Sequence, residues 1–410
     1  MANPVSPLAP AGFPDLPPIP GVRLASHNCG IRYKGRDDLM LAVLPEGTTV
    51  AGVLTRSLTA SAPVHWCREG LKGGSARCLV VNAGNSNAFT GAAGEAFVKA
   101  TVEEAARLAG CRTSEVFVAS TGVIGQPMPA DRIASQLAAI FPKASEAAWE
   151  PAARAIMTTD TFPKGSTATA VIDGVTVRLS GFAKGSGMIA PDMATMLGFL
   201  FTDAAIAAPV LQKLLSAATD RSFNCTTVDG DTSTSDTVIL VATGKAGHEA
   251  ITDAADPRLR GFKRALDKVC LDLAQQIVRD GEGATKFVTL TVRGAASNRA
   301  AKRIALTVAN SPLVKTAIAG EDANWGRIVA AVGRAGEKAD RDRLVISIGG
   351  VQICADGMEV PGYDEAPVAA HMKGREIDID VDLGLGRGRA TVWTCDLTHR
   401  YIDINGSYRS

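Results

Sequence analysis

One segment of the 410-residue chain combines residue types that can carry out covalent chemistry. A Gly-Ser-Gly turn follows Lys184, and an Ala-Pro-Asp sequence leads to Ala194 and Thr195, where an apolar stretch begins. A threonine in this position can attack the carbonyl before it, and hydrolysis of the resulting ester leaves Thr195 as a new N-terminus. Its α-amine, with a pKa of about 7.7–8.0 in model peptides, can then act as the base for its own hydroxyl. From residue type alone, such a threonine is more often an ordinary β-branched residue of a strand.

Motifs for several common catalytic sites are missing from the sequence. It contains no G-x-x-x-x-G-K-[ST] phosphate loop, no G-x-S-x-G nucleophile turn and no H-E-x-x-H zinc motif. The glycine-rich segment 384–388 precedes an expected strand and does not open a helix, which argues against a dinucleotide site. Asp229 and Asp231 lack the closing glutamate of a calcium loop, and the five histidines form no ligand pair. The sequence therefore predicts no metal site.

The segments around these residues alternate between strand-like and helix-like patterns, which indicates an α/β protein. Hairpins are expected over residues 39–56 and 167–182, the second with an Asp-Gly turn. Further strands are expected at 76–82, 114–120 and 196–201, and helices at 94–110, 129–142, 145–157, 207–219 and 257–279. Later strands are expected at 287–293, 304–308, 343–354, 376–382 and 390–395. This shift toward strands predicts a change of domain near residues 283–287.

The composition limits the class of protein. Lys and Arg number 43 and Asp and Glu 42, and a net charge of +1 argues against a nucleic-acid-binding or polybasic membrane protein. No stretch is long and apolar enough to span a bilayer. Residues 1–20 hold seven of the 20 prolines, which predicts a flexible arm, and the lack of a basic start argues against a signal peptide. The eight scattered cysteines favour reduced thiols in the cytoplasm.

Several blocks of the sequence, in order, resemble one known family, the ornithine acetyltransferases, which are glutamate N-acetyltransferases of arginine biosynthesis. Besides 184–203, the matching blocks are 82–91, 120–125, 157–164, 223–236, 280–286, 320–327 and 401–410. The resemblance covers essentially residues 20–410, and so many blocks in order are more specific than any single motif.

The resemblance implies an αββα-type sandwich of the aminopeptidase/ornithine-acetyltransferase type, related to N-terminal-nucleophile enzymes, with a smaller C-terminal α/β domain. The expected parts are a flexible arm at 1–20, a catalytic sandwich domain at 21–284 and a C-terminal domain at 285–410 whose tail returns to the site. Self-cleavage between Ala194 and Thr195 is also implied. It would give an α chain of residues 1–194 and a β chain of residues 195–410, assembled as a heterotetramer of two α and two β chains.

The resemblance further implies a ping-pong reaction without a cofactor. Thr195 would take the acetyl group from N-acetylornithine as an ester, and glutamate would then receive it as N-acetylglutamate. Some members of the family also use acetyl-CoA as donor. The other implied roles are an oxyanion hole of Thr121 and Gly122 and substrate contacts from Thr161, Lys184, Thr195, Glu282, Asn405 and Ser410.

Each implied role has a physical basis and an ordinary alternative. A strand that ends at Thr121-Gly122 can present N–H groups to an oxyanion, or it can simply turn. Lys184 suits a carboxylate, although most lysines are solvated. Glu282 lies between two glycines and suits an ammonium group, although an exposed helix end is equally ordinary. Thr161 can be a turn residue, and a C-terminal tail can fray.

Two other functions fit part of the sequence. A self-processing aminopeptidase or amidase with an N-terminal nucleophile would share the cleavage and the acyl-enzyme, but water would be the final acceptor. A non-enzymatic binding protein would keep the chain uncut. The blocks around Thr121, Lys184 and Glu282 favour the acetyltransferase.

Overall fold

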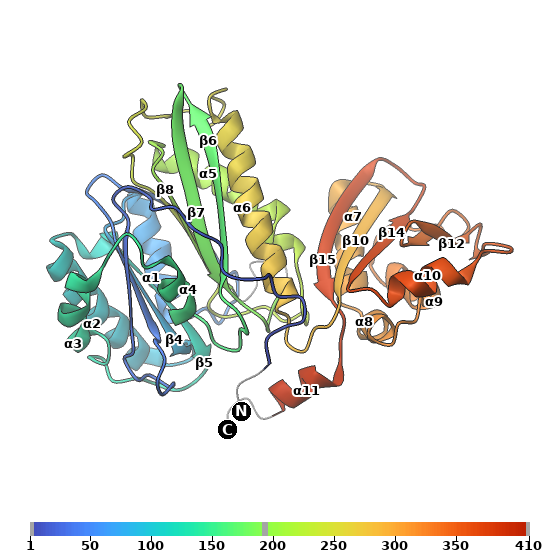
Figure 1. Ribbon diagram of the computed structural model, residues 1–410, viewed down its shortest axis with the longest axis horizontal. Coiled ribbons are helices and arrows are strands. Elements are labelled where there is room, and N and C mark those ends of the chain that lie inside the picture. The colour runs from blue at the N-terminus through green and yellow to red at the C-terminus, as the bar shows by residue number, and fades with distance from the viewer. Residues whose placement is uncertain (1–3, 191–195, 407–410) are drawn as a thin grey trace.

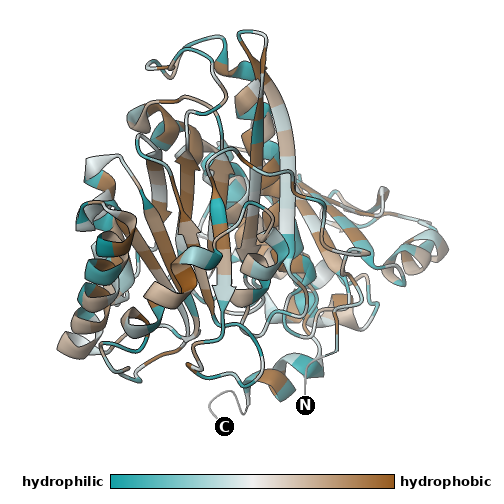
Figure 2. Cartoon of the chain, turned by 60° about the vertical axis from the view of Figure 1, so that its left-hand side comes forward, coloured by the Kyte–Doolittle hydropathy of each residue, from teal (hydrophilic) through white to brown (hydrophobic). Residues whose placement is uncertain are grey.

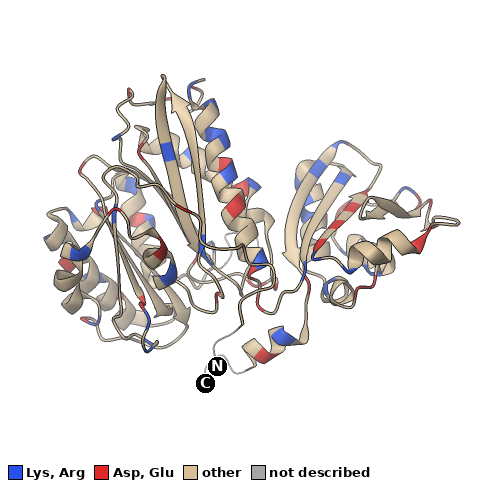
Figure 3. Ribbon diagram, viewed as in Figure 1, with Lys and Arg blue, Asp and Glu red and all other residues tan. Residues whose placement is uncertain are grey.

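The computed structural model describes residues 4–190 and 196–406, and within these ranges the strands form three β-sheets. A four-stranded and a five-stranded sheet stack face to face, and the third sheet lies in a neighbouring lobe (Figure 1). Acidic and basic residues are interspersed over both lobes, in keeping with the balanced charge (Figure 3). In the described part of the chain no helix has the length and apolar character needed to cross a membrane.

The four-stranded sheet has the order β1-β2-β4-β5, in which β4 and β5 run parallel. Its strands are β1 (Arg23–His27), β2 (Leu39–Val43), β4 (Cys78–Asn85) and β5 (Val116–Val123). The helices beside it are α1 (Ala62–Gly70), α2 (Gly91–Ala109) and α3 (Ala134–Ile140). Short 3-10 helices lie at Leu71–Gly73, Thr113–Glu115, Phe141–Lys143 and Phe223–Cys225.

The five-stranded sheet has the order β3-β9-β8-β7-β6. Its strands are β3 (Thr49–Leu54), β6 (Lys164–Ile172), β7 (Val175–Lys184), β8 (Leu197–Thr202) and β9 (Thr237–Ala242). Helices α5 (Ala208–Arg221) and α6 (Leu259–Arg279) pack on its outer face. The apolar residues of α6 recur every three or four positions and are buried, as the sequence pattern predicts.

The core between the two sheets is apolar and aromatic. Trp149, on α4 (Trp149–Ala155), packs edge-to-face against Phe182 and Phe201, with ring centroids 6.3 and 5.4 Å apart. Many segments of the stacked strands are apolar, while the helices also carry hydrophilic residues (Figure 2). Helices outside two stacked sheets make an αββα sandwich, which confirms the expected fold class.

The third sheet has the order β13-β12-β11-β14-β10-β15. Its strands are β10 (Phe287–Ala295), β11 (Val345–Ile348), β12 (Val351–Ala355), β13 (Met358–Glu359), β14 (Glu376–Asp382) and β15 (Gly388–Cys395). The helices of this lobe are α7 (Asn298–Ala309), α8 (Pro312–Ala319), α9 (Trp325–Gly333) and α10 (Glu365–Met372). After β15 the chain leaves the lobe and forms α11 (His399–Asn405) below it (Figure 1).

Local signals predicted one hairpin correctly and one wrongly. The β6–β7 hairpin is confirmed, and Asp173 and Gly174 of its turn have the positive φ angles of 51° and 76° that an Asp-Gly turn requires. The hairpin expected over residues 39–56 is wrong, because β2 pairs with β1 and β4 whereas β3 pairs with β9 in the other sheet. β2 is fully buried and β3 is buried at its centre, and the turn between them carries the chain from one layer to the next.

Two further strand predictions need correction. Residues 304–308 belong to α7, because Ser297 caps that helix and Ala301, Ile304 and Val308 bury one helical face. The β-branched residues there resemble a strand only when the preceding turn of helix is ignored. The strand expected at 114–120 continues to Val123 as β5.

The N-terminal arm also differs from the expectation. Residues 4–20 contain neither helix nor strand, as their prolines dictate, but they are packed on the sandwich. Leu16 and Ile19 are buried in the core between the sheets, and Phe13 lies against Gly165 of β6. Apolar residues between the prolines give the arm a surface to bury.

Candidate active site

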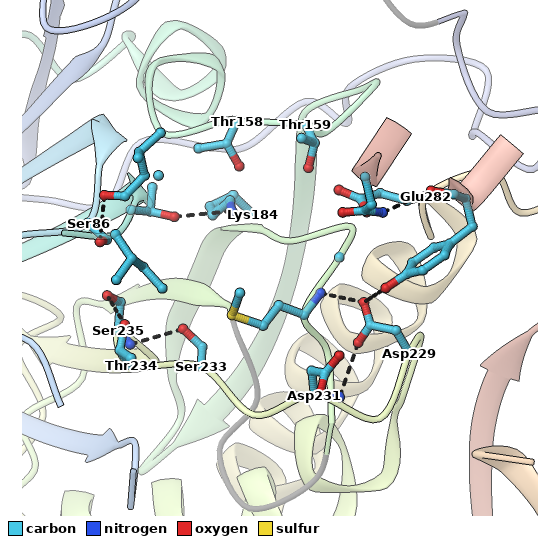
Figure 4. A pocket seen from close by; sticks show the side chains of 18 residues that line it. Ser86, Thr158, Thr159, Lys184, Asp229, Asp231, Ser233, Thr234, Ser235 and Glu282 are labelled. Carbon is cyan, nitrogen blue, oxygen red and sulfur yellow. Dashed lines mark hydrogen bonds between the residues drawn. The ribbon is translucent and has the colours of Figure 1, made fainter. Parts of the chain in front are cut away.

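The topology brings the ends of several strands to one place. Lys184, the last residue of β7, pairs with Leu197 at the start of β8, and Leu197 pairs with Thr237 at the start of β9. A cavity of about 320 Å³ lies near this edge and close to the end of β5 (Figure 4). Its lining residues are Ser86, 121–124, Thr158, Thr159, Lys184, Gly187, Met188, Asp229, Asp231, 233–235, Glu282, Tyr401 and Asn405.

Lys184 forms a cationic part of the cavity wall, although it is only 3% exposed. Its Nζ donates a hydrogen bond to Thr121 Oγ1 over 3.3 Å and lies 3.8 Å from Asp160 Oδ2. Burial lowers the pKa of Lys184 below its usual value, and the Asp160 carboxylate opposes this shift. Because its nearest carboxylate is at the edge of ion-pair distance, the ammonium group can attract an incoming carboxylate.

A buried ion-pair network supports Lys184 from behind. Lys164 Nζ lies 2.7 Å from Asp160 Oδ1 and 2.5 Å from Asp280 Oδ2, and all three side chains are fully buried. Burial alone would raise the pKa of Asp160, but the charges of Lys164 and Lys184 hold it below its usual range. Asp160 also accepts a hydrogen bond from the backbone N of Gly185 over 2.6 Å, so the network fixes the end of β7.

Thr161 belongs to this network and does not line the cavity. Its backbone N and its Oγ1 donate to the Asp280 carboxylate over 2.9 and 2.5 Å, and its Oγ1 accepts from the backbone N of Ser6 over 2.9 Å. Thr158 and Thr159, in the same loop, line the cavity instead. Thr161 therefore supports the cavity wall from outside, whereas its neighbours in the same loop form part of the wall.

Thr121 and Gly122 lie in the cavity wall at a distortion of β5. The register against β4 shifts there, so that Asn85 faces both Thr121 and Val123. Gly122 has a φ of 130°, and a Cβ on it would lie 2.3 Å from the carbonyl carbon of Gly84. Glycine is therefore required at this position, where the strand bends into the cavity wall.

Glu282 brings a buried carboxyl group to the other side of the cavity. It lies in the turn after α6, in which Gly283 has a φ of 77°. Its Oε2 accepts a hydrogen bond from Asn405 Nδ2 over 2.7 Å, so α11 brings the C-terminal segment to the cavity. Burial raises the pKa of Glu282, and the hydrogen bonds from Asn405 and Thr159 oppose this shift.

Sequence reasoning gave no individual role to the acidic loop that closes the cavity near α11. Asp229 accepts hydrogen bonds from the backbone N of Met188 and Ile189 over 2.6 and 2.9 Å, and from Tyr401 Oη over 3.2 Å. Burial raises the pKa of Asp229, and burial together with Asp229 raises that of Tyr401. In the sequence, the only indication that this loop belongs to the cavity was the polar composition of residues 223–236.

Three residues with predicted roles, Ala194, Thr195 and Ser410, lie outside the described ranges. The structure does place Met196, the residue covalently attached to Thr195. Its backbone N donates to Asp236 Oδ1 over 3.0 Å, and its carbonyl oxygen accepts from the backbone N of Thr237 over 3.1 Å. The N–H and the carbonyl group of Met196 are thus both hydrogen-bonded, which fixes the backbone just before β8.

The fold is an αββα sandwich, with two stacked sheets between helices. Its cavity combines a buried lysine, buried carboxyl groups and many hydroxyl groups, which is the composition of an enzyme active site. Comparison with known proteins gives the family. The family model ArgJ matches residues 23–410. The chain belongs to the ArgJ family, which confirms the resemblance to the ornithine acetyltransferases, and it is an acyltransferase of arginine biosynthesis.

Individual relatives agree with this assignment. The "Arginine biosynthesis bifunctional protein ArgJ" of Mesorhizobium japonicum is 56% identical over 413 residues and covers 100% of both chains. The protein of the same name from Gluconobacter oxydans is 58% identical over 407 residues, which are 99% of this chain and 96% of that protein. A crystal structure of the Bacillus halodurans protein is 44% identical with a TM-score of 0.50, and covers 52% of this chain and 100% of the solved one.

Proposed function

We propose that the protein transfers the acetyl group of N2-acetylornithine to glutamate through an acetyl ester on Thr195, giving ornithine and N-acetylglutamate. The observation that carries this proposal is that Lys184 and Glu282 line one cavity. A lysine there suits the α-carboxylate that ornithine and glutamate share, and a carboxylate suits the ammonium group of ornithine. The names of the curated relatives support a role in arginine biosynthesis.

Self-cleavage would prepare the nucleophile. Thr195 Oγ1 attacks the carbonyl carbon of Ala194, the C–N bond breaks, and the proton of the hydroxyl passes to the leaving amine. Water then hydrolyses the ester and leaves chains 1–194 and 195–410. The whole solved chain of the Bacillus halodurans relative corresponds to only 52% of this chain, and residues 195–410 are 216 of the 410 residues. This agreement supports a protein that matures into two pieces.

The acetyl transfer then has two half-reactions. The α-amine of Thr195 takes the hydroxyl proton, Oγ1 attacks the acetyl carbonyl, and ornithine leaves with a proton on its amine. The amine of glutamate attacks the ester in the second half-reaction, and Thr195 regains its hydroxyl. Thr121 and Gly122 are the proposed donors to the oxyanion, and Lys184 donates to Thr121 Oγ1, which leaves the Thr121 hydroxyl hydrogen available for that purpose.

The remaining roles follow from the same assignment. Asn405, which is held by Glu282, would contact substrate, and Thr161 and Ser410 are kept as proposed binding residues. The word "bifunctional" in the relatives' names supports acetyl-CoA as a second donor.

We further propose that the chain is organised in three parts, residues 1–20, 21–284 and 285–410. We also propose a heterotetramer of two α and two β chains, and a cytoplasmic location. Seven of the eight unpaired cysteines are buried, which favours reducing surroundings.

The main alternative is hydrolysis by the same acyl-enzyme. Intact-mass spectrometry before and after addition of N-acetylornithine should show two chains and an acetyl group on the chain that begins at Thr195. Adding glutamate should then remove the acetyl group as N-acetylglutamate. Thr195→Ala should remain uncut and inactive, whereas Thr195→Ser, which keeps the hydroxyl and amine, should still be cut. Acetate released without N-acetylglutamate would reject the transferase in favour of an amidase.

A further inference from the structure

A buried carboxyl group that the proposed reaction does not use lies at the start of β9. Asp236 has no exposed surface. Its Oδ1 accepts the hydrogen bond from Met196 N over 3.0 Å, while its Oδ2 has no hydrogen-bond partner within residues 4–190 and 196–406. A buried carboxyl oxygen without a partner is unfavourable, so this atom needs an explanation.

The position of Asp236 in the fold supplies one. Met196 N is the amide nitrogen of the Thr195–Met196 peptide bond. Asp236 therefore accepts a hydrogen bond from the peptide group that joins the proposed nucleophile to β8. The backbone around Asp236 is itself fixed, because its carbonyl oxygen accepts from Thr55 N over 3.0 Å. Leu197 and Thr237 are paired in the parallel β8–β9 register, one residue further along each strand. Asp236 therefore anchors the residue after Thr195 to a rigid sheet edge.

The surroundings of Asp236 favour a proton on its carboxyl group. A carboxylate without exposed surface has lost its hydration, and the hydrogen bond from Met196 N together with the Ser233 hydroxyl does not replace it. Burial raises the pKa of Asp236 well above its usual value, against the hydrogen bond from Met196 N, the charge of Lys184 on β7 and the hydroxyl of Ser233. A neutral carboxyl group accepts from Met196 N through one oxygen and has an O–H donor at the other.

We propose that Asp236 is a positioning residue that acts as an uncharged acid, holding the Thr195–Met196 peptide group in place for self-cleavage and acetyl transfer. This inference rests on the proposed function only in taking Thr195 as the nucleophile. It assigns Asp236 no proton transfer. Its contribution is an acceptor for Met196 N and a donor at Oδ2, both of which a side-chain amide can reproduce.

The variants Asp236→Asn and Asp236→Ala distinguish a role for an uncharged carboxyl group at this position from a role for a charged carboxylate. Purified precursor is followed by intact-mass spectrometry for the rate of cleavage, and the matured enzyme is assayed for acetyl transfer from pH 6 to pH 9. We expect Asp236→Asn to cleave and turn over within about threefold of wild type, because asparagine keeps an acceptor and a donor. Asp236→Ala should slow cleavage by at least tenfold, which corresponds to about 1.4 kcal/mol or more in the activation free energy.

A matched control lies at the opposite end of β8. Asp203 is as buried as Asp236, and its Oδ1 accepts from the backbone N of Arg178 over 2.7 Å. Asp203→Asn should leave the cleavage rate unchanged. If Asp236→Asn is more than tenfold slower than wild type, a charged carboxylate is required and the proposal is wrong; a wild-type rate in Asp236→Ala also overturns it.

Separate variants test Thr195 as the nucleophile and Asp236 as the positioning residue. Cleavage of Thr195→Ala would reject the nucleophile and with it the proposed function, whatever Asp236 does. If Asp236→Ala does not fold, the pH profiles decide. Wild type should lose activity relative to Asp236→Asn as the pH rises and Asp236 gains its charge. If the rate of wild type divided by that of Asp236→Asn instead increases with pH, the charged form of Asp236 is the active one and the proposal is wrong.

Discussion

Asn405 Nδ2 donates a hydrogen bond to Glu282 Oε2 over 2.7 Å, across 123 positions of sequence, and both side chains line the same cavity. Burial raises the pKa of Glu282, so its carboxyl group tends toward the neutral form. The amide of Asn405 favours the charged form, which is the one that binds an ammonium group. The contact therefore couples α11 to the charge state of a carboxyl group in the cavity wall.

Asn405→Ala should weaken the binding of N-acetylornithine. A hydrogen bond to a charged group contributes about 1.5–3 kcal/mol, which corresponds to a KM about ten to a hundred times higher. The midpoint of thermal unfolding should change little, because α11 has no buried residue. Asp403→Ala, an exposed site on the same helix, is the control for steady-state kinetics. An unchanged KM in Asn405→Ala would show that the tail does not act on Glu282.

The lowered pKa of Lys184 predicts a pH dependence. The folded protein gives up this proton at a lower pH than the unfolded chain does, so the contribution of Lys184 to stability rises with pH between the two pKa values. Binding has the opposite sign, since a neutral Lys184 no longer attracts a carboxylate. We expect the KM of glutamate to rise on the alkaline side, below the pH at which an ordinary lysine titrates.

Lys184→Arg tests this assignment, because a guanidinium group stays charged over the accessible range. The alkaline rise in the KM of glutamate should be absent in this variant, even if its larger side chain lowers kcat. Lys184→Met should raise KM at every pH. A rise in KM that persists unchanged in Lys184→Arg would assign it to another group.

The buried network behind the cavity predicts a large effect on stability. Lys164→Met leaves the carboxyl group of Asp280 buried without its cation and leaves Asp160 only the more distant Lys184, and breaking such a buried pair costs about 3–5 kcal/mol. Urea unfolding measures this loss. Lys268→Met, which removes an exposed pair with Asp272, should cost at most about 1 kcal/mol. If the two variants lose the same free energy of unfolding, the buried Lys164 network contributes no more to stability than an exposed ion pair does.

Local structure was predictable where the sequence carries a local signal. The turn at Asp173 and Gly174 needs only its two residues, so the β6–β7 hairpin could be predicted. The strands β2 and β3 carry no signal for their partners, which lie far away in sequence and in different sheets. Their pairing follows from the burial of both layers at once, which no short window of sequence contains.

The site was predictable mainly through the resemblance to a family. Physical reasoning alone gave Lys184 and Glu282 an ordinary interpretation beside the functional one, and only their shared cavity brings them together. Asp236 and Tyr401 lie in blocks that were noticed but given no role of their own. Their burial and the particular atoms they contact appear only in the folded chain.

The bend of β5 predicts that Gly122→Ala damages the protein through the backbone. A Cβ at this position would lie 2.3 Å from the carbonyl carbon of Gly84 and would also require a φ of 130° that alanine avoids. Overpacking and backbone strain together cost about 2–5 kcal/mol, so unfolding should occur at lower urea and kcat should fall as the wall moves. Gly125→Ala is the matched control, because its φ is 79° but nothing lies within 4 Å of the added Cβ. That variant should lose only about 1 kcal/mol and keep its kcat. If the two variants lose the same stability, the close approach of β4 and β5 does not explain the glycine at position 122.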